Sequence, residues 1–130
     1  MIKYVVLVLV LAGGSYYLSR HASLDSSLQY VEQHKDASWA PRANFTIAFI
    51  YYEQEEYPKA QAAFTQLLTD YPTGQFTVRS LVYLETAAEY NHDWETAKTS
   101  LDRYLDEFSD GRDIALMRQR RELLRYNHGL

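Results

Sequence analysis

The chain has 130 residues, a formal net charge of −4 and 47% hydrophobic residues. This length allows one domain with a modest core, and the hydrophobic content excludes a disordered chain. The absence of Cys excludes disulfides and thiolate metal sites, and the acidic balance argues against nucleic acid as a general partner.

The N-terminal segment is apolar. Residues 4–12 form an unbroken hydrophobic run, and no charged residue occurs between Lys3 and Arg20. At about 1.5 Å per residue this uncharged run spans roughly 24 Å, against about 30 Å of bilayer hydrocarbon. A basic start followed by an apolar centre is typical of a cleaved signal peptide, with a cut near Gly13-Gly14, and also of an uncleaved signal anchor. We favour the anchor, which makes residues 1–20 a single transmembrane helix with residues 4–18 in lipid.

The remainder of the chain has a helical pattern. Residues 21–38 form a linker in which Leu24, Leu28 and Val31 predict a short amphipathic helix. Longer periodic segments follow, separated by polar breaks at 54–58, 71–75, 91–93 and 109–111. Sustained alternation of polar and apolar residues is absent from the sequence, so strands are not expected. The predicted fold class is therefore all-α.

Two segments of the sequence match each other. An aromatic residue, an Ala three residues later and a large apolar residue four further on occur as Tyr57-Ala60-Phe64 and as Trp94-Ala97-Leu101. The segment from Leu67 to Pro72 matches the segment from Tyr104 to Ser109 at the same offset of 37 residues. A small residue allows two helices to approach closely, and Pro72 cannot continue a helix. The self-match predicts two repeated helix pairs.

These residues resemble the tetratricopeptide-repeat (TPR) family. In its 34-residue pattern a small residue of the second helix, helix B, packs against the first, helix A, and a Pro ends helix B. Ala60 and Ala97 take the small position, whereas Glu85 departs from the family's small residue in the second helix A. The resemblance implies a short antiparallel helix-pair solenoid over residues 39–130, with repeats at about 41–74 and 78–111 and a capping helix at 112–126.

The resemblance also suggests a location. A Tyr-Pro pair near the end of helix B and a slightly long loop look like the TPR proteins of bacterial envelope assembly. Together with the apolar N-terminus, this predicts a single-pass protein of the bacterial inner membrane with a periplasmic TPR domain.

The sequence carries no enzyme signature. None of the four His pairs with another ligand type at metal spacing, and there is neither a glycine-rich phosphate loop nor a nucleophile elbow. The expected protein is not an enzyme and has no cofactor and no metal site.

Two surfaces are candidates for binding a partner. The resemblance implies that helix A residues line a groove, and large aromatic and Arg side chains there suit an interface. Phe45 and Phe49 have the alternative of being core residues, since apolar helix positions usually are. A stripe of Arg on the last helix is the second candidate, with a solvated face as its alternative. The predicted partner-binding residues are Arg42, Phe45, Phe49, Tyr52, Arg79, Val82, Thr86 and Tyr90 in the groove and Arg118, Arg121 and Arg125 in the stripe.

Two functions fit this pattern. In the first, the chain is a non-catalytic scaffold, an accessory subunit of a membrane-protein complex. In the second, it is a reversible peptide-binding adaptor or chaperone of envelope assembly. The shallow groove that two repeats provide favours the first. The predicted partners are other proteins and, through residues 4–18, membrane lipid.

Overall fold

A computed structural model describes residues 2–18 and 24–130. All regular structure in these two ranges is α-helical. The helices are α1 (Ile2–Leu18), α2 (Leu24–Gln33), α3 (Ala40–Glu53), α4 (Tyr57–Asp70), α5 (Thr77–Tyr90), α6 (Trp94–Glu107) and α7 (Ile114–His128).

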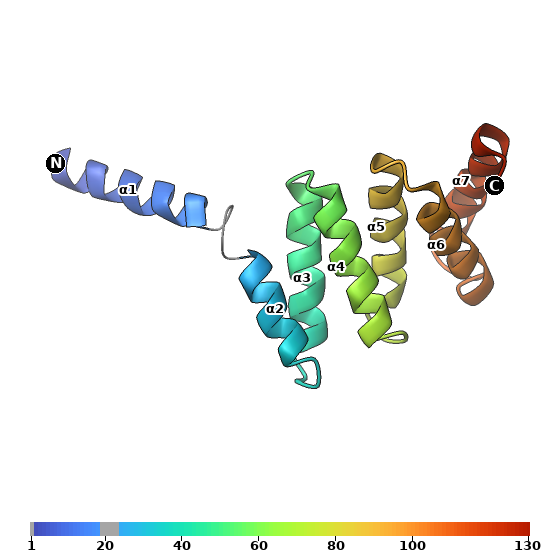
Figure 1. Cartoon of the computed structure of the whole chain (residues 1–130), viewed down its shortest axis with the longest axis horizontal. Coiled ribbons are helices and arrows are strands. Elements are labelled where there is room, and N and C mark those ends of the chain that lie inside the picture. Colours follow the sequence, from blue (N-terminus) through green and yellow to red (C-terminus); the bar gives the residue numbers. More distant parts are fainter. Residues whose placement is uncertain (1, 19–23) are drawn as a thin grey trace.

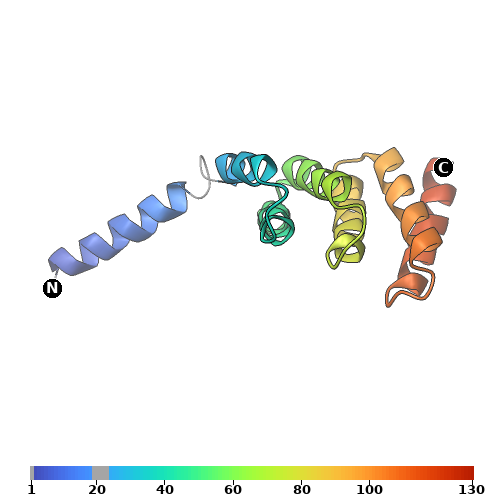
Figure 2. The same ribbon diagram turned by 90° about the horizontal axis from the view of Figure 1, so that it is seen from below.

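Helices α2 to α7 stack side by side in chain order (Figure 1). The most extensive contacts are those of α3 with α4, α4 with α5 and α5 with α6, and α3 also touches α5. Seen from below, α3 and α5 lie in one layer, and α2 and α4 lie in the other (Figure 2). This two-layer stack of helix pairs is the arrangement that the self-match of the sequence predicted.

Local sequence explains where the helices begin and end. Pro41 and Pro58 stand in the first turns of α3 and α4, where a missing backbone N–H costs nothing. Asp93 caps α6, because its Oδ1 accepts from the Thr96 N–H at 3.2 Å and its Oδ2 from the Thr96 hydroxyl at 2.7 Å. These hydrogen bonds hold the pKa of Asp93 below its ordinary value. Pro72 follows the end of α4 and prevents its continuation.

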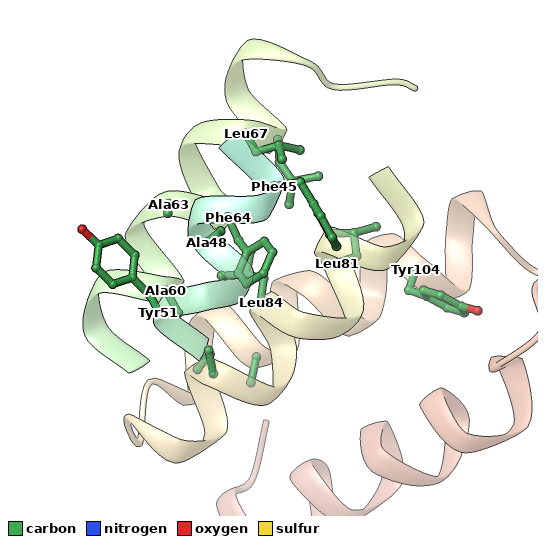
Figure 3. Packing of buried hydrophobic residues seen from close by; sticks show 14 of the residues in the cluster. Phe45, Ala48, Tyr51, Ala60, Ala63, Phe64, Leu67, Leu81, Leu84 and Tyr104 are labelled. Atoms are coloured by element: carbon green, nitrogen blue, oxygen red, sulfur yellow. The ribbon is translucent and has the colours of Figure 1, made fainter. Parts of the chain in front are cut away.

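The core is built on small residues at helix crossings. Ala48, Ala60 and Ala63 are fully buried where α3 meets α4 (Figure 3). Ala97 is also fully buried, in α6. Alanine at such positions lets large neighbours fill the space, and Phe64 is fully buried beside them. Burying a side chain of that size contributes about 1.5–3 kcal/mol.

Helix α2 packs on α3 as part of the stack. Its Val31 is buried in the core, and its Asp25 accepts a short hydrogen bond from the Tyr51 hydroxyl of α3. Lys59 of α4 pairs with the same carboxylate at 3.2 Å. The Tyr51 and Lys59 contacts lower the pKa of Asp25, the Tyr51 hydrogen bond most strongly. The segment between residue 24 and the first helix pair is therefore attached to that pair.

The predicted transmembrane anchor is wrong. Residues 2–18 do form an apolar helix, and α1 projects away from the stack in both views (Figures 1 and 2). However, none of the helices in the described part of the chain has the length and apolar character needed to cross a membrane. The reason is length: the 17 residues of α1 rise about 26 Å, short of a hydrocarbon core of about 30 Å, and Gly13 and Gly14 interrupt its aliphatic run.

This result also removes the conclusions that depended on the anchor. The prediction of a single-pass protein of the bacterial inner membrane was wrong for the same reason. Contact of residues 4–18 with lipid has no support. The flanking residue Arg20, which was expected to mark the end of the anchor, lies outside the described residues.

Candidate partner-binding site

A cluster of tyrosines joins the ends of the first two helix pairs. The ring of Tyr52 lies 5.7 Å from Tyr57 and 5.0 Å from Tyr83, and Tyr57 stacks on Tyr90 at 4.3 Å between ring centres. We call Tyr52, Tyr57, Tyr83 and Tyr90 the tyrosine patch. Burial raises the pKa of Tyr52 and of Tyr57 above the ordinary value for tyrosine. Tyr90 is 58% exposed and presents an aromatic face to solvent.

The two predicted phenylalanines differ in position. Phe45 is only 6% exposed, and its ring packs against those of Phe64, Phe76 and Tyr83. Phe49 is half-buried, and its ring lies 5.4 Å from Tyr83, beside the tyrosine patch. Phe45 therefore belongs to the core, and Phe49 borders the surface.

The two arginines that recur at the 37-residue offset are both exposed. The Arg79 guanidinium lies 4.6 Å from the centre of the Phe45 ring, a cation–π contact that fixes its position. Arg42 lies one turn before Phe45 in α3. Its guanidinium forms no ion pair within residues 2–18 and 24–130, so its charge is available to a partner.

Two side chains in the middle of α5 contact Arg120 of α7. Val82 is half-buried, and the Thr86 hydroxyl donates to the Val82 carbonyl at 3.0 Å. The Nη1 of Arg120 donates to the Thr86 hydroxyl at 3.0 Å and to Oε2 of Glu85 at 2.5 Å. Glu85 and Arg120 therefore connect the second helix pair to the last helix.

Glu85 is a buried acid. Its side chain is fully buried, and its Oε1 has no hydrogen-bond partner among the described residues. Burial, followed by the nearby Glu89 carboxyl, raises the pKa of Glu85 to about 7, and Arg120 offsets part of this effect. The cost of burying the charge therefore exceeds the attraction of Arg120.

The predicted Arg stripe on α7 is mostly paired within the chain. Nε of Arg121 contacts Asp102 at 2.6 Å, and its Nη2 donates to the Leu130 carbonyl at 3.0 Å. Arg125 pairs with Glu122 one turn away at 2.7 Å. Arg118 is exposed and has no ion pair in the described part of the chain. The three side chains thus act separately, and Arg121 serves to fix α7 on α6.

Sequence reasoning missed Tyr57, Tyr83 and the Glu85–Arg120 pair. In the sequence analysis Tyr57 served only as the aromatic residue of the repeated helix B pattern and was not predicted to bind a partner. One signal for the pair was available, since Glu85 occupies a position that the repeat pattern reserves for a small residue. A long acidic side chain at a helix crossing needs a basic partner nearby, and Arg120 is that partner.

Residues 42–74 match the family model described as Tetratricopeptide repeat. These residues include α3 and α4, the first helix pair of the stack, so this part of the chain is a tetratricopeptide repeat. No curated protein matches the chain. Tetratricopeptide repeats are typically interaction domains and not catalytic ones, which indicates a protein–protein interaction role for this part of the chain.

Proposed function

We propose that the chain is an accessory subunit that holds other proteins in a complex through the outward face of α3 and α5. The observation that carries this proposal is the tyrosine patch with its exposed Tyr90, which adjoins a tetratricopeptide repeat. Tyr and Arg supply most of the binding energy at protein interfaces, and rigid, stacked rings lose little entropy on binding. The expectation of a membrane complex depended on the anchor and has no other support.

The proposed binding face runs along the layer that contains α3 and α5. Arg42 and Arg79 lie near the N-terminal ends of these helices, and Tyr52 and Tyr90 lie near their C-terminal ends. The face therefore carries positive charge at one rim and aromatic area at the other. It suits a partner segment with an acidic end and an apolar end.

The proposal includes a second repeat at about 78–111 and a cap at 112–126. In its support, α5 and α6 pack as closely as α3 and α4 do. The last helix buries Met117 and Leu124 against this pair and leaves most of its Arg and polar residues exposed, as the end of a solenoid requires.

The test is retention of natural partners by tagged full-length protein. Tyr90→Ala and Arg79→Ala should each weaken retention by about 1–2 kcal/mol and leave the far-UV circular dichroism unchanged. Lys98→Ala, in the second helix of the second pair, is the matched control and should have little effect. If neither Tyr90→Ala nor Arg79→Ala weakens the retention of partners, the proposal is wrong.

The same experiment separates a permanent subunit from a reversible adaptor. A subunit should co-purify in a fixed ratio and survive extended washing. An adaptor should dissociate within minutes and bind isolated peptides of its partner.

A further inference from the structure

A small cavity lies between the ends of α5 and α7. It has a volume of about 240 Å³, and Trp94, the first residue of α6, lines it together with side chains of the last turns of α5 and α7. The end of α3 lies at the same end of the stack (Figure 1). The cavity is next to the tyrosine patch, since Glu89 lines it and Tyr90 follows directly in α5.

The walls of the cavity are mostly apolar. Leu124 is buried, Trp94 is half-buried and Leu123 is exposed. His128 also lines the cavity, and its ring stacks on the Trp94 ring at 3.9 Å between ring centres. This contact restrains both rings, so the wall that they form is already in place in the free protein.

Glu89 supplies the only carboxylate among the described residues that line the cavity. Its carboxyl group hydrogen-bonds to that of Glu85, one turn earlier, and it forms no ion pair in the described part of the chain. On α7, Arg120 pairs with Glu85 instead, at 2.5 Å. Arg125 pairs with Glu122 at 2.7 Å. A half-buried carboxylate beside apolar walls, without a basic partner, favours the binding of a cation.

The surroundings of the cavity are also acidic. Burial raises the pKa of Tyr57 most strongly, and the nearby carboxylates of Glu53 and Glu55 add to this effect. Neither carboxylate forms an ion pair among the residues that the structure describes. Helices α3 and α5 end here, and a helix C-terminus carries roughly half a negative elementary charge. Arg42 and Arg79 lie near the other ends of these helices, so the proposed binding face has opposite charges at its two ends.

A basic side chain suits this cavity better than a metal ion does. Metal ions need several oxygen or nitrogen ligands, and the described part of the chain has no group of three or more His, Asp or Glu that is placed to hold one. The side chains of Lys and Arg combine an aliphatic stem with a charged end. This combination matches apolar walls that carry a single carboxylate.

We propose that the cavity binds a basic side chain, Arg or Lys, of the partner protein. The stem packs against Trp94 and Leu123, and the charged group pairs with Glu89. This inference rests on the proposed function, because it names the chemistry of the partner at the end of the face where the tyrosine patch lies. A partner segment that also meets Arg42 and Arg79 is then oriented, with its basic group toward the ends of α3 and α5.

The test uses full-length protein and blocked amino acids as probes. Nα-acetylarginine amide and Nα-acetyllysine amide carry the two basic side chains, and Nα-acetylcitrulline amide is the neutral control. The chain has two Trp, so in ¹⁵N–¹H spectra the indole N–H signal of Trp94 reports on the cavity and that of Trp39 is the internal reference. The Trp94 signal should shift saturably with a basic probe and not with the citrulline probe. The Trp39 signal should not shift.

Three variants test the role of the carboxylate. Glu89→Gln should weaken the apparent affinity by roughly 10-fold or more, because a charge-assisted hydrogen bond is lost. Glu95→Gln is the matched control and should leave the affinity almost unchanged, because Glu95 is exposed beside Trp94 but does not line the cavity. Asn127→Asp adds a second carboxylate to the lining and should tighten binding several-fold, a gain that damage to the fold cannot produce.

The two basic probes identify the side chain. The probe that saturates the Trp94 signal at the lower concentration shows whether the cavity prefers Arg or Lys. The proposal is overturned if neither basic probe shifts the signal, if the shift rises linearly, or if the citrulline probe acts equally. An affinity that Glu89→Gln leaves unchanged also overturns it.

Retention of natural partners separates this proposal from the proposed function. Glu89→Gln should weaken retention and Glu95→Gln should not. If the basic probes fail to bind while Tyr90→Ala and Arg79→Ala still weaken retention, the basic-side-chain site is wrong and the proposed function stands. If none of the changes at Glu89, Tyr90 and Arg79 weakens retention, both proposals are wrong.

Discussion

Glu85→Gln is expected to stabilise the protein above pH 7. Burial raises the pKa of Glu85 from 4.5 to about 7, so folding favours the protonated acid. The stabilisation of the folded state that comes from the raised pKa of Glu85 is fully present below pH 4.5. It is lost as the pH rises to 7, because in this range the unfolded chain releases the Glu85 proton more readily than the folded chain does. Gln resembles the neutral acid, can still accept from Arg120 and does not titrate.

The size of the effect follows from the two pKa values. At pH 8 the charged Glu85 costs about 3 kcal/mol of unfolding free energy relative to the neutral form, at about 1.4 kcal/mol per pKa unit. At pH 5 most of the folded protein already holds the proton, and the cost is about 1 kcal/mol. The advantage of Glu85→Gln over the wild type should therefore grow by about 2 kcal/mol between these values of pH.

Urea denaturation followed by circular dichroism measures this difference. Comparing variant and wild type at each pH cancels most other titrating groups. Glu122→Gln is the matched control, because Glu122 is exposed and, among the residues that the structure describes, pairs only with Arg125; it should change stability by less than about 0.5 kcal/mol at both values of pH. If Glu85→Gln proved less stable than the wild type at pH 8, the attraction of Arg120 would outweigh burial and the reasoning would fail.

Three further predictions concern packing and capping. Ala97→Trp should lower stability by about 1–3 kcal/mol or more, because Ala97 is fully buried; an unchanged melting temperature would show that the α6 crossing has spare room. Gly111→Ala should cost about 1–3 kcal/mol, since the new Cβ would stand 2.5 Å from the Tyr104 hydroxyl, and the double variant with Tyr104→Phe should recover part of the loss in thermal melts. Asp93→Ala should lower the free energy of unfolding by about 1 kcal/mol, because α6 loses its cap. Asp93→Asn should keep most of the stabilisation by the cap in the same denaturation assay.

The helical stack could be predicted because its signals are local. Ala60 and Ala97 recur with flanking large residues, and the Pro and Asp at helix starts mark boundaries that backbone geometry enforces. Such signals depend on neighbours within one or two turns. The helices they predicted therefore agree with those observed to within a few residues.

The transmembrane anchor failed because the prediction gave apolar composition more weight than length, although the uncharged run spans only roughly 24 Å against about 30 Å of hydrocarbon. The aliphatic run ends at Ala12, and the apolar helix that contains it stops one turn short of what a bilayer requires.

The candidate site was predicted only in part. The resemblance to the TPR family placed Tyr52, Arg79 and Tyr90 on helix A, but it could not show that Phe45 turns inward or that Arg121 is paired with Asp102. These outcomes depend on contacts between residues distant in the chain. Glu85 was noticed as a departure from the repeat pattern, yet its partner Arg120 lies 35 residues away and no local rule connects them.

Site-specific photo-crosslinking tests the central claim most directly. A crosslinking amino acid is placed either at Tyr90, on the proposed binding face, or at Thr99, which is exposed on α6. The account predicts that partner proteins crosslink strongly through position 90 and weakly or not at all through position 99. Equal crosslinking at both positions, or crosslinking at position 99 alone, would contradict binding through the face of α3 and α5.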